Sequence, residues 1–180
     1  MRTLMSSLAA SIVLAFGMAG APPLALAQAQ PHTSPQTLVR EHHEIEDTLA
    51  RLSREHGRVG AAAKHALAVI APHERHEEEI VLPLLGLVDS IVDHGVSPDM
   101  AWAVQMSDRL RTDRAKLSDE HTQVVAALDE LAAAGRRQHS QVVVTFSESV
   151  AAHAVNDNEV IIPTALLVGI HVREKLGIKE

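Results

Sequence analysis

Two histidine motifs alternate along the chain and then recur about 80 residues later. The first motif, L-x-x-E-H-x6-L-x-x-L, contains a lone histidine. The second, H-x3-[D/E]-x-E followed by three apolar residues and a proline, pairs a histidine with a carboxylate one helical turn away. Together the four motifs supply six side chains that can bind a metal: His42, His73, Glu77, His121, His153 and Asp157. If the first motif is called A and the second B, their order along the chain is A-B-A-B, which predicts two copies of one helical hairpin.

These six residues occupy positions where a core side chain is expected. Each predicted helix has a seam of apolar residues spaced three and four apart, and the six polar side chains fall on those seams. If the two hairpins turn near residues 58–59 and 137–138 at a common end, the helical rise of 1.5 Å per residue places all six in one layer. Burying an unpaired carboxylate or imidazole costs several kcal/mol, so six of them need a shared partner.

Four imidazoles and two carboxylates suit a pair of first-row transition metals, with the carboxylates bridging and the histidines terminal. Calcium and magnesium prefer more oxygen ligands, and a structural zinc needs only four ligands. No histidine of this chain has a glutamate three residues before it, as the ferritin-like di-iron pattern requires. We favour two non-haem iron ions, with zinc or manganese as alternatives.

The composition predicts an all-α fold in which an antiparallel four-helix bundle is built from two repeated helical hairpins. The chain has 180 residues and 46% hydrophobic residues, enough for one domain with a core, and most of its common residues favour helices. Helices are expected at about 34–56, 61–92, 98–134 and 140–176. Pro72, Pro83 and Pro163 lie inside these ranges and should kink them.

Residues 1–27 have the features of a signal peptide. A basic start at Arg2 precedes an apolar run from Leu8 to Ala19 that is too short to span a membrane comfortably, and Ala25-Leu26-Ala27 offers a cleavage site. A retained membrane anchor is the alternative. Residues 28–33 are expected to form a flexible tail and residues 34–176 the bundle. The prediction is therefore a periplasmic or secreted protein.

The charge of the exported chain excludes some partners. Without Arg2 it has 15 basic and 23 acidic residues, a formal charge of −8. This charge argues against nucleic acid, and against an anionic membrane once the signal peptide is removed. The absence of cysteine excludes a lipid-anchored lipoprotein and disulfides.

The A-B-A-B order of a lone histidine followed by H-x3-E or H-x3-D resembles the hemerythrin-like, cation-binding HHE family over residues 34–176. The resemblance implies a four-helix bundle around a di-iron centre bridged by two carboxylates and an oxygen species, with Glu77 and Asp157 as the bridges and the four histidines as the other ligands. Oxygen-carrying members have a second histidine one turn from the first on the third helix, where this chain has Leu117 and Val125. They also place the last carboxylate five residues after its histidine, not four. A missing ligand could leave an open iron position.

We expect a protein that binds or senses oxygen or a similar small ligand, in a pocket walled by Ile45, Ile80, Val124 and Val160. Its protein partner is not indicated. A di-iron oxidase or peroxidase is one alternative, although the chain has no tyrosine or cysteine for radical or thiol chemistry. A periplasmic divalent-cation buffer is another. A metal- and oxygen-binding protein is favoured over an enzyme.

Several acids near the motifs have open roles. Glu46, one turn after His42, is a candidate extra ligand. Glu41 and Glu120 precede the lone histidines and could orient an imidazole or form solvated salt bridges. Glu78 and Glu79 are expected on the solvated face.

Overall fold

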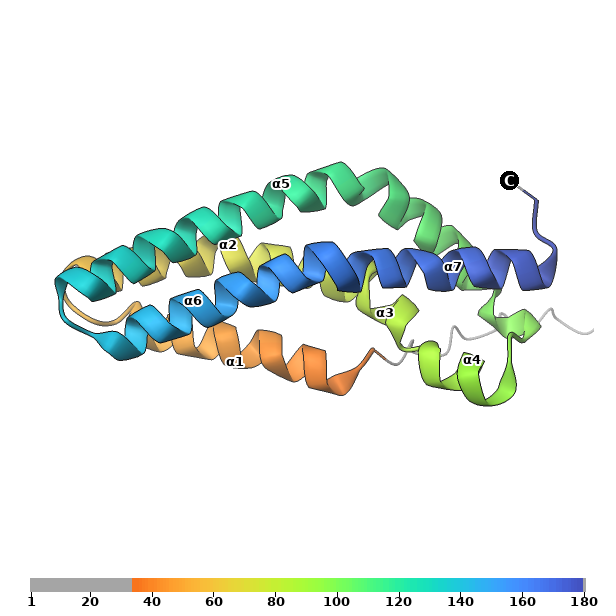
Figure 1. The fold of residues 1–180 in the computed structure, drawn as a ribbon, viewed down its shortest axis with the longest axis horizontal. Coiled ribbons are helices and arrows are strands. Elements are labelled where there is room, and N and C mark those ends of the chain that lie inside the picture. The colour runs from red at the N-terminus through yellow and green to blue at the C-terminus, as the bar shows by residue number, and fades with distance from the viewer. Residues whose placement is uncertain (1–33, 180) are drawn as a thin grey trace, which may run out of the picture. The chain divides into compact units, whose positions relative to one another are not determined.

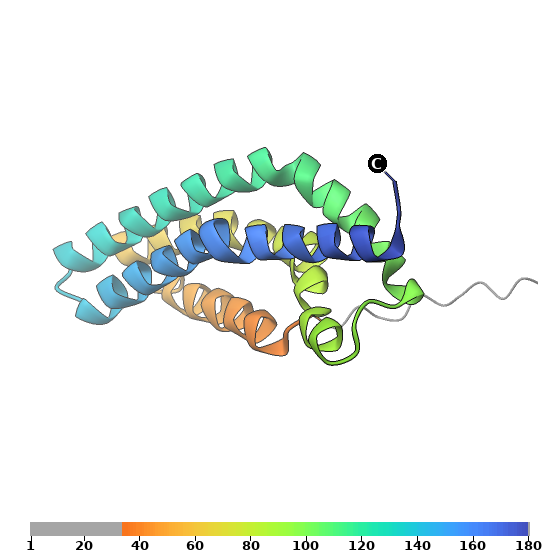
Figure 2. The same ribbon diagram turned by 45° about the vertical axis from the view of Figure 1, so that its right-hand side comes forward.

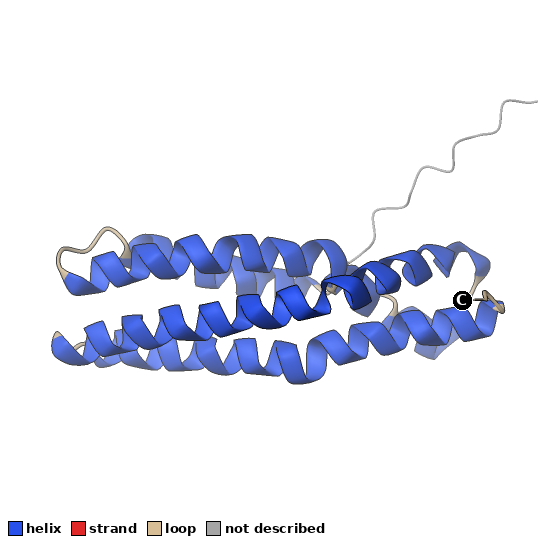
Figure 3. Cartoon of the chain, turned by 90° about the horizontal axis from the view of Figure 1, so that it is seen from above, coloured by secondary structure: helices blue, strands red, loops and turns tan. Residues whose placement is uncertain are grey.

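The computed structural model describes residues 34–179, and every regular element in this range is helical (Figures 1 and 3). In chain order the elements are α1 (Gln36–Leu52), α2 (Arg58–Ile80), α3 (Leu82–Leu85), α4 (Val88–His94), the short 3₁₀ helix η1 (Pro98–Ala101), α5 (Trp102–Arg137), α6 (Gln141–Asn156), the π-helical turn η2 (Asp157–Ile161) and α7 (Ile162–Leu176). The prediction of an all-α protein is confirmed. The predicted signal peptide and tail lie outside the described residues.

The helices pack side by side as a bundle. Helix α1 packs on α2, α2 on α5, and α5 on both α6 and α7, while the short α3 contacts α7 (Figures 1 and 2). In this part of the chain, no helix is both long and apolar enough to cross a membrane. The helical bundle is thus established, and its finer description as two repeated antiparallel hairpins stays a prediction.

Proline determines where the second predicted helix ends. Pro72 lies inside α2 without ending it, but α2 stops at Ile80, and Pro83 occupies the first turn of the separate helix α3. Because proline has no backbone N–H and its ring crowds the carbonyl one turn earlier, a regular helix cannot pass through Pro83 undisturbed. The prediction of one kinked helix from 61 to 92 is therefore wrong beyond Ile80, where α3 and α4 replace it.

Pro163 has a milder effect on the last helical segment. It lies in the first turn of α7, and the five-residue π-helical turn η2 precedes it. The predicted irregularity at Pro163 is therefore present as a wider turn through which the chain continues as a helix. This turn begins at Asp157, one of the candidate ligands, and single π-helical turns within helices often occur at functional sites.

Two apolar cores lie on either side of the polar layer. On α5, Leu117 belongs to one core and Val124 to the other, and His121 lies between them. On α2 the same two cores contain Ile80 and Ile70, and the predicted ligands of this helix fall in the interval between them. The candidate ligands are therefore enclosed by apolar packing along the bundle axis.

We predict that Gly169→Ala lowers the free energy of unfolding by about 1–3 kcal/mol, the usual cost of overpacking a core. Gly169 lets α7 approach α5, because an added Cβ would lie 2.1 Å from Cβ of Ser107 and 3.2 Å from the carbonyl oxygen of Ala103. Urea denaturation measures the change.

The matched control for this variant is Ser107→Gly, which removes the side chain that the new methyl group meets. The double variant should lose less stability than the sum of the two single losses, since neighbouring substitutions are not additive. Strictly additive losses would show that Gly169 and Ser107 do not make the close contact.

Candidate metal centre

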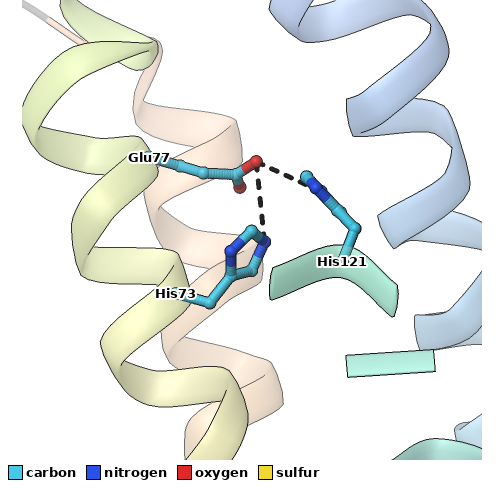
Figure 4. Close-up of side chains that lie close together, drawn as sticks. All are labelled: His73, Glu77 and His121. Carbon is cyan, nitrogen blue, oxygen red and sulfur yellow. Dashed lines mark ion pairs between the residues drawn. The ribbon is translucent and has the colours of Figure 1, made fainter. Parts of the chain in front are cut away.

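Glu77 is at the centre of a buried cluster formed by α2 and α5 (Figure 4). Its Oε1 lies 3.6 Å from Nε2 of His73 and 3.4 Å from Nε2 of His121. His73 and Glu77 are one turn apart on α2, so they share a face of that helix, and His121 reaches them from α5. Ligand atoms of these three buried residues all lie within 4.8 Å of one another. One cation could contact all three.

The second oxygen of Glu77 faces a different histidine. Its Oε2 lies 3.8 Å from Nε2 of His42, a buried residue of α1. The two carboxylate oxygens therefore point to histidines of different groups, with His73 and His121 on one side and His42 on the other. A carboxylate that bridges two cations needs this arrangement.

His153 and Asp157 complete the layer from α6 and the start of η2. Nε2 of His153 lies 3.1 Å from Oδ2 of Asp157, and the ring of His153 meets the ring of His42 edge to face with 5.8 Å between centroids. A small cavity is lined by both of these histidines, Asp157, His73 and Glu77. The structure thus brings all six sequence-predicted residues together, and their role as ligands stays a prediction.

The apolar wall of this cavity differs in part from the predicted wall. It is formed by Ile70, Val124, Val150 and Ala154. Val124 was predicted, but Val160 is 51% exposed in the π-helical turn, so its assignment to the wall is wrong. Ile80 belongs to the core next to this layer, and Ile45 lines a groove between α1 and α6.

Three atoms of the layer form no hydrogen bond of good geometry within the described part of the chain, although each lies near an oppositely charged or ionisable group. They are Oε1 of Glu77, Nε2 of His121 and Nε2 of His153, and all three are buried. Leaving a buried polar atom unsatisfied costs about 1–3 kcal/mol, and more for a charged group. Metal cations accept imidazole nitrogen and carboxylate oxygen together, so the residues fit a metal centre.

The two carboxylates of the layer have opposite pKa shifts. Burial, and then the negative charge of Glu77, raise the pKa of Asp157 to about 7. Burial also acts to raise the pKa of Glu77, but the contact with His121 and the positive charge of His73 outweigh it, so this pKa is lowered. A proton on Asp157 thus offsets part of the buried negative charge of the layer. Bound cations would displace this proton.

Comparison with protein families identifies the family to which the chain belongs. A model of the hemerythrin HHE cation-binding domain matches residues 33–165. The chain belongs to this family. The suspected resemblance is confirmed: membership implies cation binding, and the His/Glu cluster is a candidate for the cation site. No curated protein and no solved structure matches the chain.

The outer nitrogen of each histidine in this hemerythrin-family site faces a hydrogen-bond acceptor. The Nδ1 distances are 3.1 Å from His42 to Glu78, 3.2 Å from His73 to Glu120, 2.9 Å from His121 to the carbonyl oxygen of Leu117, and 3.9 Å from His153 to Glu41. A proton on Nδ1 leaves the Nε2 lone pair free to bind a metal, and such partners commonly fix the ring orientation. Three rings are held closely, and His153 is not.

The acids around the site only partly follow the predictions. Of the two roles left open for Glu120, the structure shows a contact with a histidine, although this is His73 and not its neighbour His121; Glu120 also accepts a hydrogen bond from His76. Glu78 was placed on the solvated face, yet its carboxylate contacts His42, so that prediction is wrong. Glu79 is exposed and pairs with Arg109, as a solvated residue should.

Glu74 is a site residue that the sequence reasoning missed. It is 4% exposed, lines the cavity of the layer, and has a buried Oε2 with no hydrogen-bond partner among the described residues. Burial, and then the charge of Glu46, raise its pKa to about 9. Glu46 thus interacts with Glu74. The spacing could have predicted the burial of Glu74: it follows Ile70 by four residues and precedes Glu77 by three, which places it on the buried face of α2.

We predict that Glu120→Ala weakens cation binding by about 10–100-fold, the usual effect of removing an outer partner of a metal-binding histidine. The substitution frees the ring of His73 to rotate. Competition between the protein and a chromogenic chelator for Co²⁺ measures the Kd.

Glu79→Ala is the matched control, because it removes an exposed glutamate of the neighbouring helix α2 that contacts no histidine of the layer. Its Kd should equal that of the unmodified protein. If both variants bind Co²⁺ as tightly as the unmodified protein, Glu120 does not orient His73.

Proposed function

We propose that this chain is an exported, hemerythrin-like non-haem di-iron protein that binds or senses oxygen or a similar small ligand. The observation that carries the proposal is the buried layer in which four imidazoles and two carboxylates converge with unpartnered nitrogen and oxygen atoms. As ligands we propose the six residues His42, His73, Glu77, His121, His153 and Asp157. Membership of a cation-binding family supports this assignment.

Two cations fit the layer better than one. The two carboxylate oxygens of Glu77 face different histidines, His42 and His121. Asp157 contacts His153, which Glu77 does not contact. A single four-coordinate ion would leave two of the six groups buried without a partner, at a cost of several kcal/mol. Bridging roles for Glu77 and Asp157 therefore remain our assignment.

The donor set is compatible with the iron that we propose. Imidazole nitrogen suits iron, zinc and copper, while carboxylate oxygen suits harder ions such as manganese, so a mixed set without thiolate is compatible with iron and also with zinc or manganese. A pair of ferrous ions, when bound, supplies the electrons that an oxygen-binding or oxygen-reducing centre requires. The protein contributes an apolar wall that includes Val124 and Val150.

The finer fold and the location belong to the same proposal. The segments 36–52, 58–80, 102–137 and 141–176 are taken as an antiparallel four-helix bundle of two repeated hairpins. The composition of residues 1–27 supports export to the periplasm or the medium. No nucleic-acid partner is included, and no protein partner is assigned.

Glu74 favours a second candidate, a di-iron oxidase or peroxidase. Such an enzyme needs a proton donor beside the cations, and Glu74 is an acid buried in the wall of the same cavity. A protein that only stores divalent cations has no need of this buried acid.

Anaerobic reconstitution with ferrous iron, followed by desalting, tests the proposal. Elemental analysis should give two iron ions per chain. Oxygen should then produce new near-ultraviolet or visible charge-transfer absorption, reversible for a carrier and irreversible for an oxidase or an autoxidising sensor. Glu77→Ala should lose both iron and the absorption, whereas the matched surface variant Glu79→Ala should keep both.

The negative results have separate meanings. A plateau at one iron per chain would contradict the di-iron centre and the bridging role of Glu77. Two bound ions with no optical response to oxygen would contradict oxygen chemistry and support a cation buffer.

A further inference from the structure

The turns that join α1 to α2 and α5 to α6 lie at the same end of the bundle (Figure 1). Gln138 links them, because its side-chain oxygen accepts a hydrogen bond of 2.8 Å from the backbone N–H of Val59. Residues 51–58 and 136–140, which we call the basic end, contain five of the chain's 16 lysines and arginines but only one of its 23 acidic residues. Positive charge is therefore concentrated at one end of an acidic protein.

All five basic residues of this end are exposed arginines, and most have no acidic partner. Within residues 34–179, one of them pairs with an acid, Glu148, at 3.5 Å, and the other four form no ion pair. A guanidinium group is planar and always charged, and it binds phosphate through two parallel hydrogen bonds. The basic end therefore presents several groups that are suited to phosphate. The five are Arg51, Arg54, Arg58, Arg136 and Arg137.

Helix stability does not account for all of these arginines. Three of the five lie in the last turn of α1 or α5, where a cation stabilises the helix. Arg58, however, is the first residue of α2, where the helix dipole disfavours a cation. It also lines the same groove as Arg137, about 550 Å³ in volume, and the acid of that groove, Glu130, already contacts His65. Two like charges near a helix N-terminus are explained by an anionic partner.

The basic end has too little apolar surface for a stable protein interface. Of the large apolar side chains that are exposed in residues 34–179, only Val142, at 80%, lies beside it. A stable interface buries about 800 Å² on each partner around an apolar core, which one valine does not supply. An anionic membrane, in contrast, attracts basic residues by charge alone, with a gain of about fivefold in binding for each one.

From the segregated charge, the unpaired arginines and the missing apolar core, we propose that the basic end binds the phosphate groups of an anionic phospholipid surface. Charges interact over about 8 Å at physiological ionic strength, so this end and not the net charge of the chain determines the contact. The acidic remainder of the bundle extends away from a planar surface, whereas a nucleic acid would continue along it and be repelled. The proposal does not depend on cations in the buried layer.

Cosedimentation of the purified protein with lipid vesicles tests the proposal. The protein should bind phosphatidylcholine vesicles that contain phosphatidylglycerol, and it should not bind vesicles of phosphatidylcholine alone. Added salt should release it, because the screening length falls from about 10 Å at 0.1 M to about 3 Å at 1 M. Equal binding to both kinds of vesicle, binding to neither, or binding that salt does not weaken would overturn the proposal.

A triple variant at the basic end shows whether its arginines make the contact. Arg54→Gln, Arg58→Gln and Arg137→Gln together remove three exposed charges that have no acidic partner within residues 34–179. The partition coefficient for the anionic vesicles should fall about 100-fold, as three losses of about fivefold each predict. Unchanged binding by this variant would overturn the assignment to the basic end.

The matched control removes three arginines from the rest of the bundle. Arg40→Gln, Arg75→Gln and Arg114→Gln together change the net charge by the same amount, and all three residues are exposed outside the basic end. This variant should bind the anionic vesicles as well as the unmodified protein does. An equal loss of binding in both triple variants would show that net charge governs the contact, and the basic end would then have no special role.

Inorganic phosphate distinguishes a lipid surface from a soluble ligand with the same chemistry. At a concentration equal to that of the accessible lipid phosphate, it should leave the protein on the anionic vesicles, because a surface engages several arginines at once and a single ion does not. Complete release under these conditions would show that the basic end binds single phosphate ions, and it would overturn the proposal of a membrane surface.

Discussion

The structure depends on one constraint: three buried imidazoles, one half-buried imidazole and two buried carboxylates lie in a single layer of a helical bundle, between two apolar cores. Such groups cost several kcal/mol each when they are left unpaired. Their mutual contacts are incomplete, since Oε1 of Glu77 and Nε2 of both His121 and His153 have no hydrogen-bond partner in the described chain. Cations shared among them would resolve the conflict, and the family to which the chain belongs binds cations.

The surroundings of the layer orient its histidine side chains. Glu78, Glu120 and the carbonyl oxygen of Leu117 hold the outer nitrogens of three rings, so that their inner nitrogens face the carboxylates. The apolar cores on both sides keep water away and strengthen the electrostatic interactions within the layer. The fourth ring, that of His153, lacks both the close partner and the full burial. His153 is therefore the most accessible histidine of the layer, although its motif repeats that of His73.

The sequence predicted the layer but not all of its members. Helical periodicity and a fixed rise per residue place His42, His73 and His121 at one height, provided that the two hairpins turn at a common end. The contact of Glu78 with His42 and the burial of Glu74 depend on how α1 is rotated against α2, which spacing within one helix does not determine. The end of α2 at Ile80 was missed for a related reason, because Pro72 and Pro83 carry the same local signal and only one of them coincides with a break.

The most direct test of a cation-dependent layer is thermal unfolding with and without bound metal. At a free cation concentration about 1,000 times the Kd, binding should stabilise the folded state by about 4 kcal/mol. For a chain of this length, that corresponds to a rise of roughly 10 °C in Tm. His121→Ala, which leaves the cluster incomplete, should show a much smaller rise. Coincident melting curves for the chelator-treated and metal-loaded protein would contradict the account, because they would mean that these buried side chains need no cation.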